Sequence, residues 1–218
     1  MRNQCSAIIL LLMFLSVGFI SVNVSADSIT IATFADPSPN SSNPLFTADF
    51  TQNKLTGGWS DSQTGLTLQI PYNGHSFDNA WFNIDREITL SVGIPGILYG
   101  TGPGIIKFYA DGSSADPLLV INFNSGALTL TEFGANELYA ENVTITGSEI
   151  TSPLSGEQFS FSFANLAYLP NSNNFNDGFT ATASFTSSAV PEPATVCLLS
   201  LGILSLVERK KRLLGKKQ

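Results

Sequence analysis

Alternation of apolar and polar residues runs through the chain from Asp27 to Ala189, and it restricts the fold more than any other feature. In residues 66–70, for example, three aliphatic side chains alternate with Thr67 and Gln69. A period of two residues, rich in Val, Ile, Thr, Phe and Tyr, is typical of strands that bury one face. No stretch of this region keeps a helical period, because Gly, Asn and Ser interrupt it too often. The region therefore predicts an all-β structure.

The predicted strands recur roughly every 10 to 15 residues with no helix between them. This spacing favours an antiparallel β-sandwich over a βαβ sheet. We expect about ten strands in a jelly-roll-like order. The stretches that carry the pattern are residues 28–31, 66–70, 82–90, 105–109, 118–123, 127–133, 137–146, 158–169 and 179–185.

One turn signal stands out between residues 118–123 and 127–131. Asn124, Ser125 and Gly126 separate these two alternating runs. Glycine can adopt the positive φ that a short hairpin loop requires. We expect the two runs to pair as a β-hairpin.

Phe159, Phe161 and Phe163 form an aromatic stripe on one face of a predicted strand, and Ser160 and Ser162 take the other face. Aromatic side chains bury large areas, so the stripe indicates core. The alternative is a platform that stacks on carbohydrate. The first interpretation predicts that Phe161→Ala is strongly destabilising.

The first 26 residues have the layout of a secretory signal peptide. Arg2 provides the positive start, residues 8–20 are apolar, and small or polar residues follow up to Ala26. This pattern predicts an N-terminal signal helix and cleavage between Ala26 and Asp27. The folded domain is then expected over residues 27–189.

The C-terminal segment, residues 190–218, begins with Val190, Pro191, Glu192 and Pro193. A 14-residue apolar run, 194–207, comes next, and we expect it to form a short transmembrane helix. Such a helix reaches about 21 Å, less than the roughly 30 Å of the hydrocarbon core. This shortness disfavours a plain single-span membrane protein. A basic cluster follows, which resists translocation and should stay cytoplasmic; it contains Arg209, Lys210, Lys211 and Arg212.

These three parts, in this order and at the chain terminus, resemble the PEP-CTERM sorting signal of Gram-negative bacteria. The resemblance covers the tail alone. It implies export, recognition by an exosortase (a membrane-embedded cysteine protease) and cleavage near the motif. It also implies a membrane-held intermediate at the inner membrane and a final place at the cell surface or outside the cell. Proteins of this class are associated with exopolysaccharide and biofilm matrix.

Charge and cysteine content narrow the functions of the domain. Residues 27–190 contain three Lys or Arg and fifteen Asp or Glu, a net charge of −12. Nucleic acid is therefore not an expected partner, because phosphate backbones need clustered cations. Both cysteines, Cys5 and Cys197, lie in the targeting segments, so the domain has neither disulfides nor thiol chemistry.

The main hypothesis is an exported, non-catalytic protein of the envelope or extracellular matrix, processed by an exosortase-like protease. One alternative is a carbohydrate-binding module in which an exposed Trp59 stacks on a sugar ring. The other is a secreted glycoside hydrolase with paired carboxylates, either Asp85 with Glu87 or Glu137 with Glu141.

Cofactor chemistry has little support in the sequence. His75 is the one histidine and lies beside Gly74, so we expect a surface position. A single histidine without cysteine does not support a zinc site. A structural calcium ion is the alternative to no cofactor at all, because hard cations prefer loop oxygens. Its candidate ligands are Asp111, Asp116 and Asp177.

Overall fold

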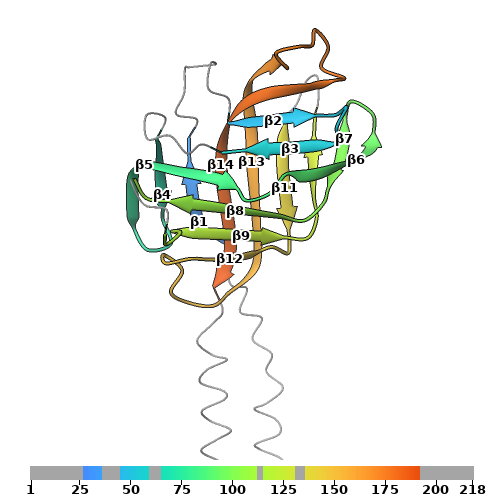
Figure 1. Ribbon diagram of the computed structural model, residues 1–218. Helices are drawn as coiled ribbons and strands as arrows, with labels where there is room; N and C mark the ends of the chain where they lie inside the picture. The colour runs from blue at the N-terminus through green and yellow to red at the C-terminus, as the bar shows by residue number, and fades with distance from the viewer. Residues whose placement is uncertain (1–26, 36–44, 59–64, 112–114, 131–135, 192–218) are drawn as a thin grey trace, which may run out of the picture.

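The computed structural model describes residues 27–35, 45–58, 65–111, 115–130 and 136–191, and this part of the chain consists of strands and their connections (Figure 1). The strands are β1 (Ile29–Phe34), β2 (Phe46–Asp49), β3 (Lys54–Gly57), β4 (Leu66–Ile70), β5 (His75–Ile84), β6 (Ile88–Ile94), β7 (Leu98–Thr101), β8 (Gly104–Tyr109), β9 (Leu119–Phe123), β10 (Gly126–Thr129), β11 (Glu137–Glu141), β12 (Thr144–Thr146), β13 (Leu154–Tyr168) and β14 (Gly178–Pro191).

Alternating burial confirms the all-β prediction. In β4 the three aliphatic side chains are buried while Thr67 and Gln69 are exposed. In β13 the side chains of Phe159, Phe161 and Phe163 are buried, which confirms the stripe as core. All the strand pairings are antiparallel.

Eight of the strands close into a barrel in the order β14-β13-β11-β10-β7-β6-β3-β2. The closing contact joins β2 to the first residues of β14, where Asp49 pairs with Gly178 and Phe46 with Ala181. The other six strands continue from β14 as an arm in the order β1-β4-β5-β8-β9-β12. Strand β14 therefore has three neighbours: β13 along its length, β2 near its start and β1 near its end.

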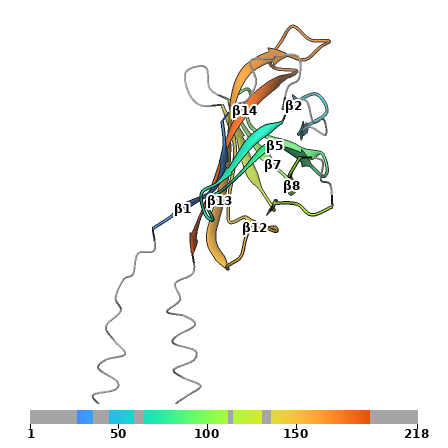
Figure 2. The same cartoon turned by 90° about the vertical axis from the view of Figure 1, so that its left-hand side faces the viewer.

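The arm folds back over the barrel strands. In Figure 1, strands β5, β8 and β9 run horizontally in front of β13 and β14, which run vertically. Figure 2 shows the two layers side by side. The arm and the barrel share one hydrophobic core between these layers.

Phenylalanine rings form the centre of this core. Phe161 of β13 lies 5.0 Å, between ring centroids, from Phe46 of β2 and 5.5 Å from Phe82 of the arm. Phe185 of β14 lies 4.8 Å from Phe161 and 4.9 Å from Phe108 of β8. Rings from the arm and rings from the barrel thus pack against one another in one core.

The sandwich prediction is wrong in its architecture. In the described part of the chain, fourteen strands rather than about ten form one continuous hydrogen-bonded order, and eight of them close into a barrel. This architecture requires β14 to pair with β2 near its start, which closes the barrel, and with β1 near its end, which begins the arm; nothing local in the sequence specifies this. Strands β2, β3 and β7 were missed because each has four residues, too few to show alternation clearly.

The hairpin prediction is also wrong. Strand β9 pairs with β8 and β12, whereas β10 pairs with β7 and β11. Asn124 and Ser125 therefore carry the chain from the arm to the barrel. Gly126 is needed for close packing instead of a turn, since a Cβ there would lie 2.6 Å from the carbonyl oxygen of Tyr139.

The stretch at 137–146, expected as one strand, is two strands. Asn142 has a φ of 54°, and β11 ends before it while β12 begins after it. The predicted signal helix and apolar helix lie outside the described residues. Within the part of the chain that the structure describes, no helix has the length and apolar character needed to cross a membrane.

Candidate functional site

A row of polar side chains crosses the outer face of five neighbouring strands. The register of strand pairing places Gln69 of β4 opposite Thr33 of β1, and Thr33 opposite Thr186 of β14. Thr186 in turn lies opposite Ser160 of β13, which lies opposite Tyr139 of β11. Directly opposed residues in antiparallel strands share a face. Five strands from remote parts of the sequence thus build one continuous polar row.

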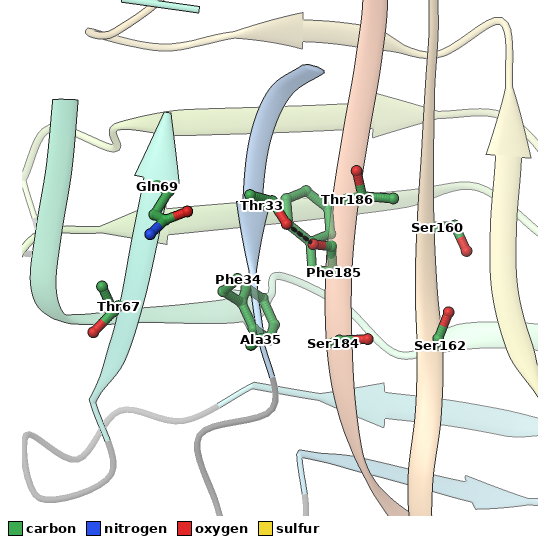
Figure 3. Close-up of a pocket in the computed structure, with 10 residues that line it drawn as sticks. All are labelled: Thr33, Phe34, Ala35, Thr67, Gln69, Ser160, Ser162, Ser184, Phe185 and Thr186. Carbon is green, nitrogen blue, oxygen red and sulfur yellow. Dashed lines mark hydrogen bonds between the residues drawn. The ribbon is translucent and has the colours of Figure 1, made fainter. Parts of the chain in front are cut away.

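A groove of about 550 Å³ lies on this face (Figure 3). Most of its polar lining is hydroxyl, contributed by serine and threonine from four strands. The side chains concerned are those of Thr33, Thr67, Ser160, Ser162, Ser184 and Thr186, together with the amide of Gln69.

A second hollow of about 250 Å³ adjoins the groove and shares Ser160 and Thr186 with it. It extends the surface to Glu137, Tyr139 and Glu141, the outward-facing residues of β11. We call the two hollows together the hydroxyl face.

Some hydroxyls of this face are already used by the protein. Thr33 Oγ1 donates a 2.8 Å hydrogen bond to the carbonyl oxygen of Phe185, and Ser160 Oγ donates one of 3.1 Å to Glu137 Oε2. Within the described residues, the hydroxyls of Ser162, Ser184 and Thr186 make no side-chain hydrogen bond. These groups are available to a ligand.

The hydroxyl face has no positive charge among its described residues. Neither hollow is lined by Lys, Arg or His, and the carboxylates of Glu137 and Glu141 lie at the β11 side. An anionic ligand would find no countercharge there. The chemistry of the surface suits a neutral, polyhydroxylated molecule.

The candidate carboxylates Asp85 and Glu87 are not placed on one strand face as the sequence predicted. They lie at the turn between β5 and β6 rather than on one strand, and each has its own lysine. Asp85 Oδ2 is 2.5 Å from Lys107 Nζ, and Glu87 Oε2 is 2.7 Å from Lys54 Nζ. The hydrogen bond that the Lys107 ammonium donates to Asp85 raises the pKa of Lys107, so the ammonium form is favoured. Each carboxylate is thus paired with a different lysine, and this geometry does not support a shared role for the two in acid–base chemistry.

Glu137 and Glu141 share the outer face of β11, with Tyr139 between them. Four residues of extended strand separate two side chains by about 13 Å. Glycosidases hold their carboxylates roughly 5 to 9.5 Å apart. This pair therefore flanks a surface and is too widely spaced to act on one glycosidic bond.

His75 lies on the surface, as expected, at the start of β5. Its side chain is 60% exposed, and its Nδ1 atom lies 2.7 Å from Glu149 Oε2. Asn73 Nδ2 donates a 2.5 Å hydrogen bond to the same oxygen. These contacts fasten the β4–β5 turn to the segment after β12.

The three candidate calcium ligands are divided between two loops. Asp111 and Asp116 are exposed and lie between β8 and β9, whereas Asp177 precedes β14 and accepts a 2.7 Å hydrogen bond from Ser172 Oγ. In the described part of the chain, no group of three or more His, Cys, Asp or Glu is placed to hold a metal ion.

The two predicted processing points are brought to the same end of the fold. Ile29, two residues after Asp27, pairs with Ala189 of β14. Val190 and Pro191 form the last pairs of the β13–β14 ladder, opposite Ser155 and Leu154. Trp59 lies outside the described residues. So do the other predicted targeting residues, namely Ala26, Glu192, Pro193, Arg209, Lys210, Lys211 and Arg212.

Sequence reasoning missed the hydroxyl face. Alternation in β13 indicated that Ser160 and Ser162 point away from the phenylalanine stripe. It did not indicate that hydroxyls of β1 and β14 lie next to them, because that depends on strand order.

No family model matches the chain, and neither a curated protein nor a solved structure is similar enough to count as a match.

Proposed function

We propose that the chain is an exported, non-catalytic protein of the cell envelope or extracellular matrix, released by an exosortase-like protease. The observation that carries this proposal is the C-terminal order of Val190-Pro191-Glu192-Pro193, apolar segment and basic cluster, matched by a signal-peptide pattern at the N-terminus. The membrane holds the intermediate through the C-terminal segment, and the released domain works at the cell surface or beyond it, with exopolysaccharide as its neighbour.

The fold supports this order of events. Because Ile29 and Ala189 are paired, both predicted targeting segments join the domain at one end. A domain held from one end can fold completely before either segment is removed. The strand β14 also supplies an extended backbone directly before Glu192, which is the conformation that proteases bind.

Intact-mass spectrometry of protein recovered from outside the cell tests the proposal. We expect a species that begins at Asp27 and ends at or beyond Pro191, because Val190 and Pro191 are held in the β13–β14 ladder. The Ser155 hydroxyl also donates a 3.2 Å hydrogen bond to the Val190 carbonyl, which protects this part of the chain further.

A lengthened apolar run serves as the matched control. Six added leucines bring the segment to about 20 residues, enough to span a bilayer, and should retain the protein in the membrane. Recovery of wild-type protein that still carries residues 209–218 would mean that the tail is a permanent anchor. Full release of the lengthened variant would also contradict the proposal.

The carbohydrate-binding alternative is favoured by one observation, the hydroxyl face; its other candidate, Trp59, lies outside the described residues. The hydrolase alternative gains no such support. Among the described residues, its candidate carboxylates are either neutralised by lysines or too far apart.

A further inference from the structure

We propose that the hydroxyl face binds a neutral polysaccharide, with the ring of Tyr139 as its stacking platform. The binding itself is a property of the folded domain. Its assignment to an extracellular matrix rests on the proposed function.

Tyr139 is the exposed aromatic residue of this face. The residue is 36% exposed and lies between Glu137 and Glu141 on β11. The other large apolar residues exposed in the described part are Val92, Ile94, Ile97, Tyr168 and Phe175, and none lines the face. A tyrosine ring offers apolar area to the C–H side of a sugar and a hydroxyl to its polar edge.

Hydrogen-bonding groups lie in the same row as this ring. Ser160 is directly opposite Tyr139, and Thr186 is next in the row. A hydroxyl can both donate and accept hydrogen bonds. The side chains of Ser162, Ser184 and Thr186 can therefore donate a hydrogen bond to a sugar hydroxyl or accept one from it. The carboxylates of Glu137 and Glu141 add strong acceptors beside the ring.

The dimensions favour a chain over a single sugar. Five adjacent strands, from β4 to β11, span roughly 19 Å at the usual strand spacing. A monosaccharide would fill only part of this row. An extended polysaccharide laid across the strands would contact hydroxyls of β1, β14 and β13 in succession.

Charge selects the kind of polysaccharide. The domain has a net charge of −12 between residues 27 and 190, and no described cation lines the face. A polysaccharide with uronate, sulfate or phosphate groups would be repelled. The same repulsion opposes a second copy of this acidic chain as the occupant.

Affinity gel electrophoresis tests the proposal. The full chain, purified in mild detergent from the expressing cells, is run through native gels that contain hydroxyethylcellulose, dextran or galactomannan, and through gels that contain alginate. We expect retardation by at least one neutral polymer and none by alginate. Intact mass is recorded for the same preparation, so failure of binding and failure of processing are observed separately.

Two matched pairs of variants locate the site. Tyr139→Ala should weaken binding about tenfold or more, the order seen when an interface aromatic is removed. Tyr168→Ala, at an exposed tyrosine roughly 27 Å farther along β13 than the residue opposite Tyr139, should leave binding unchanged. Thr186→Val should weaken binding several-fold by removing one hydroxyl, whereas Thr144→Val, at an exposed threonine of β12, should not.

Several outcomes would overturn the proposal. They are equal retardation by alginate, equal losses for Tyr139→Ala and Tyr168→Ala, and no retardation by any neutral polymer. Concentration-dependent dimerisation that Tyr139→Ala abolishes, without polysaccharide binding, would assign the face to a second copy. Circular dichroism on each variant confirms that a loss of binding is not a loss of fold.

Discussion

Single residues have opposite roles on the two faces of β13. Phe161 is fully buried and packs against rings from four other strands, whereas its neighbours Ser160 and Ser162 line the groove. One strand thus supplies both the centre of the core and part of the candidate site. Substitutions on the two faces should therefore affect different properties.

Phe161→Ala should lower the free energy of unfolding by about 3 to 5 kcal/mol, because it removes a buried ring and leaves a cavity. Ser162→Ala, on the exposed face of the same strand, should change it by less than about 0.5 kcal/mol. Urea unfolding followed by tryptophan fluorescence measures both. An unchanged midpoint for Phe161→Ala would contradict its place in the core.

Asp49 closes the turn between β2 and β3 as a charged group. Its Oδ1 atom accepts a 2.7 Å hydrogen bond from Thr51 Oγ1 and 2.9 Å bonds from the backbone N–H groups of Thr51 and Gln52. The Thr51 hydroxyl is the main cause that lowers the pKa of Asp49 below its usual 3.8. The stabilisation by the charge is thus present above pH 3.8 and is lost as the pH falls through the lowered pKa.

Asp49→Asn should therefore lower Tm at pH 7 by roughly 1 to 3 °C, and this difference from wild type should shrink towards pH 2. Thermal unfolding by circular dichroism at both pH values measures it. Asp116→Asn, at an exposed aspartate between β8 and β9, is the control and should leave Tm at pH 7 unchanged. A difference for Asp49→Asn that persists at pH 2 would contradict the role of charge.

At the scale of elements, β14 determines the architecture because it has three partners. Its first residues close the barrel against β2, and its last residues begin the arm through β1. The closing contact is close-packed at Gly178, whose φ is 143°. A Cβ at this position would lie 2.1 Å from the carbonyl oxygen of Ala48.

Gly178→Ala should destabilise the fold by roughly 1 to 3 kcal/mol from backbone strain, and further through the clash with β2. Gly74→Ala is the matched control, since Gly74 has a φ of 79° and nothing within 4 Å of the added Cβ. Denaturant unfolding of both variants separates the clash from the cost of φ. Equal losses would mean that the β14–β2 contact has no steric constraint at Gly178.

At the scale of the whole molecule, the two ends of the β13–β14 ladder differ in character. One end holds Val190 and Pro191 beside the start of β1, where the predicted targeting segments join. The other end holds Tyr168 and Phe175, whose rings pack 4.4 Å apart between centroids and are exposed. The hydroxyl face lies along the side between these ends, so a polysaccharide bound there would leave both ends accessible.

Local alternation was enough to predict an all-β domain and the burial of the Phe159, Phe161 and Phe163 stripe, and the lack of predicted helices between the strands was enough to predict antiparallel pairing. Side-chain direction in a strand depends on the adjacent backbone alone, so these features can be read residue by residue. The targeting segments are also local patterns, and their assignment depends on the sequence.

Strand order required the tertiary structure. Two features join residues that are far apart in the chain: the closure of β2 on β14 and the row from Gln69 to Tyr139. The placement of β9 and β10 in different parts of the strand order likewise depends on distant partners. Which strands become neighbours depends on how the whole set of phenylalanines packs into one core, and no short window of sequence contains that information. For the same reason the hydroxyls were visible as exposed positions, but the groove they form was not.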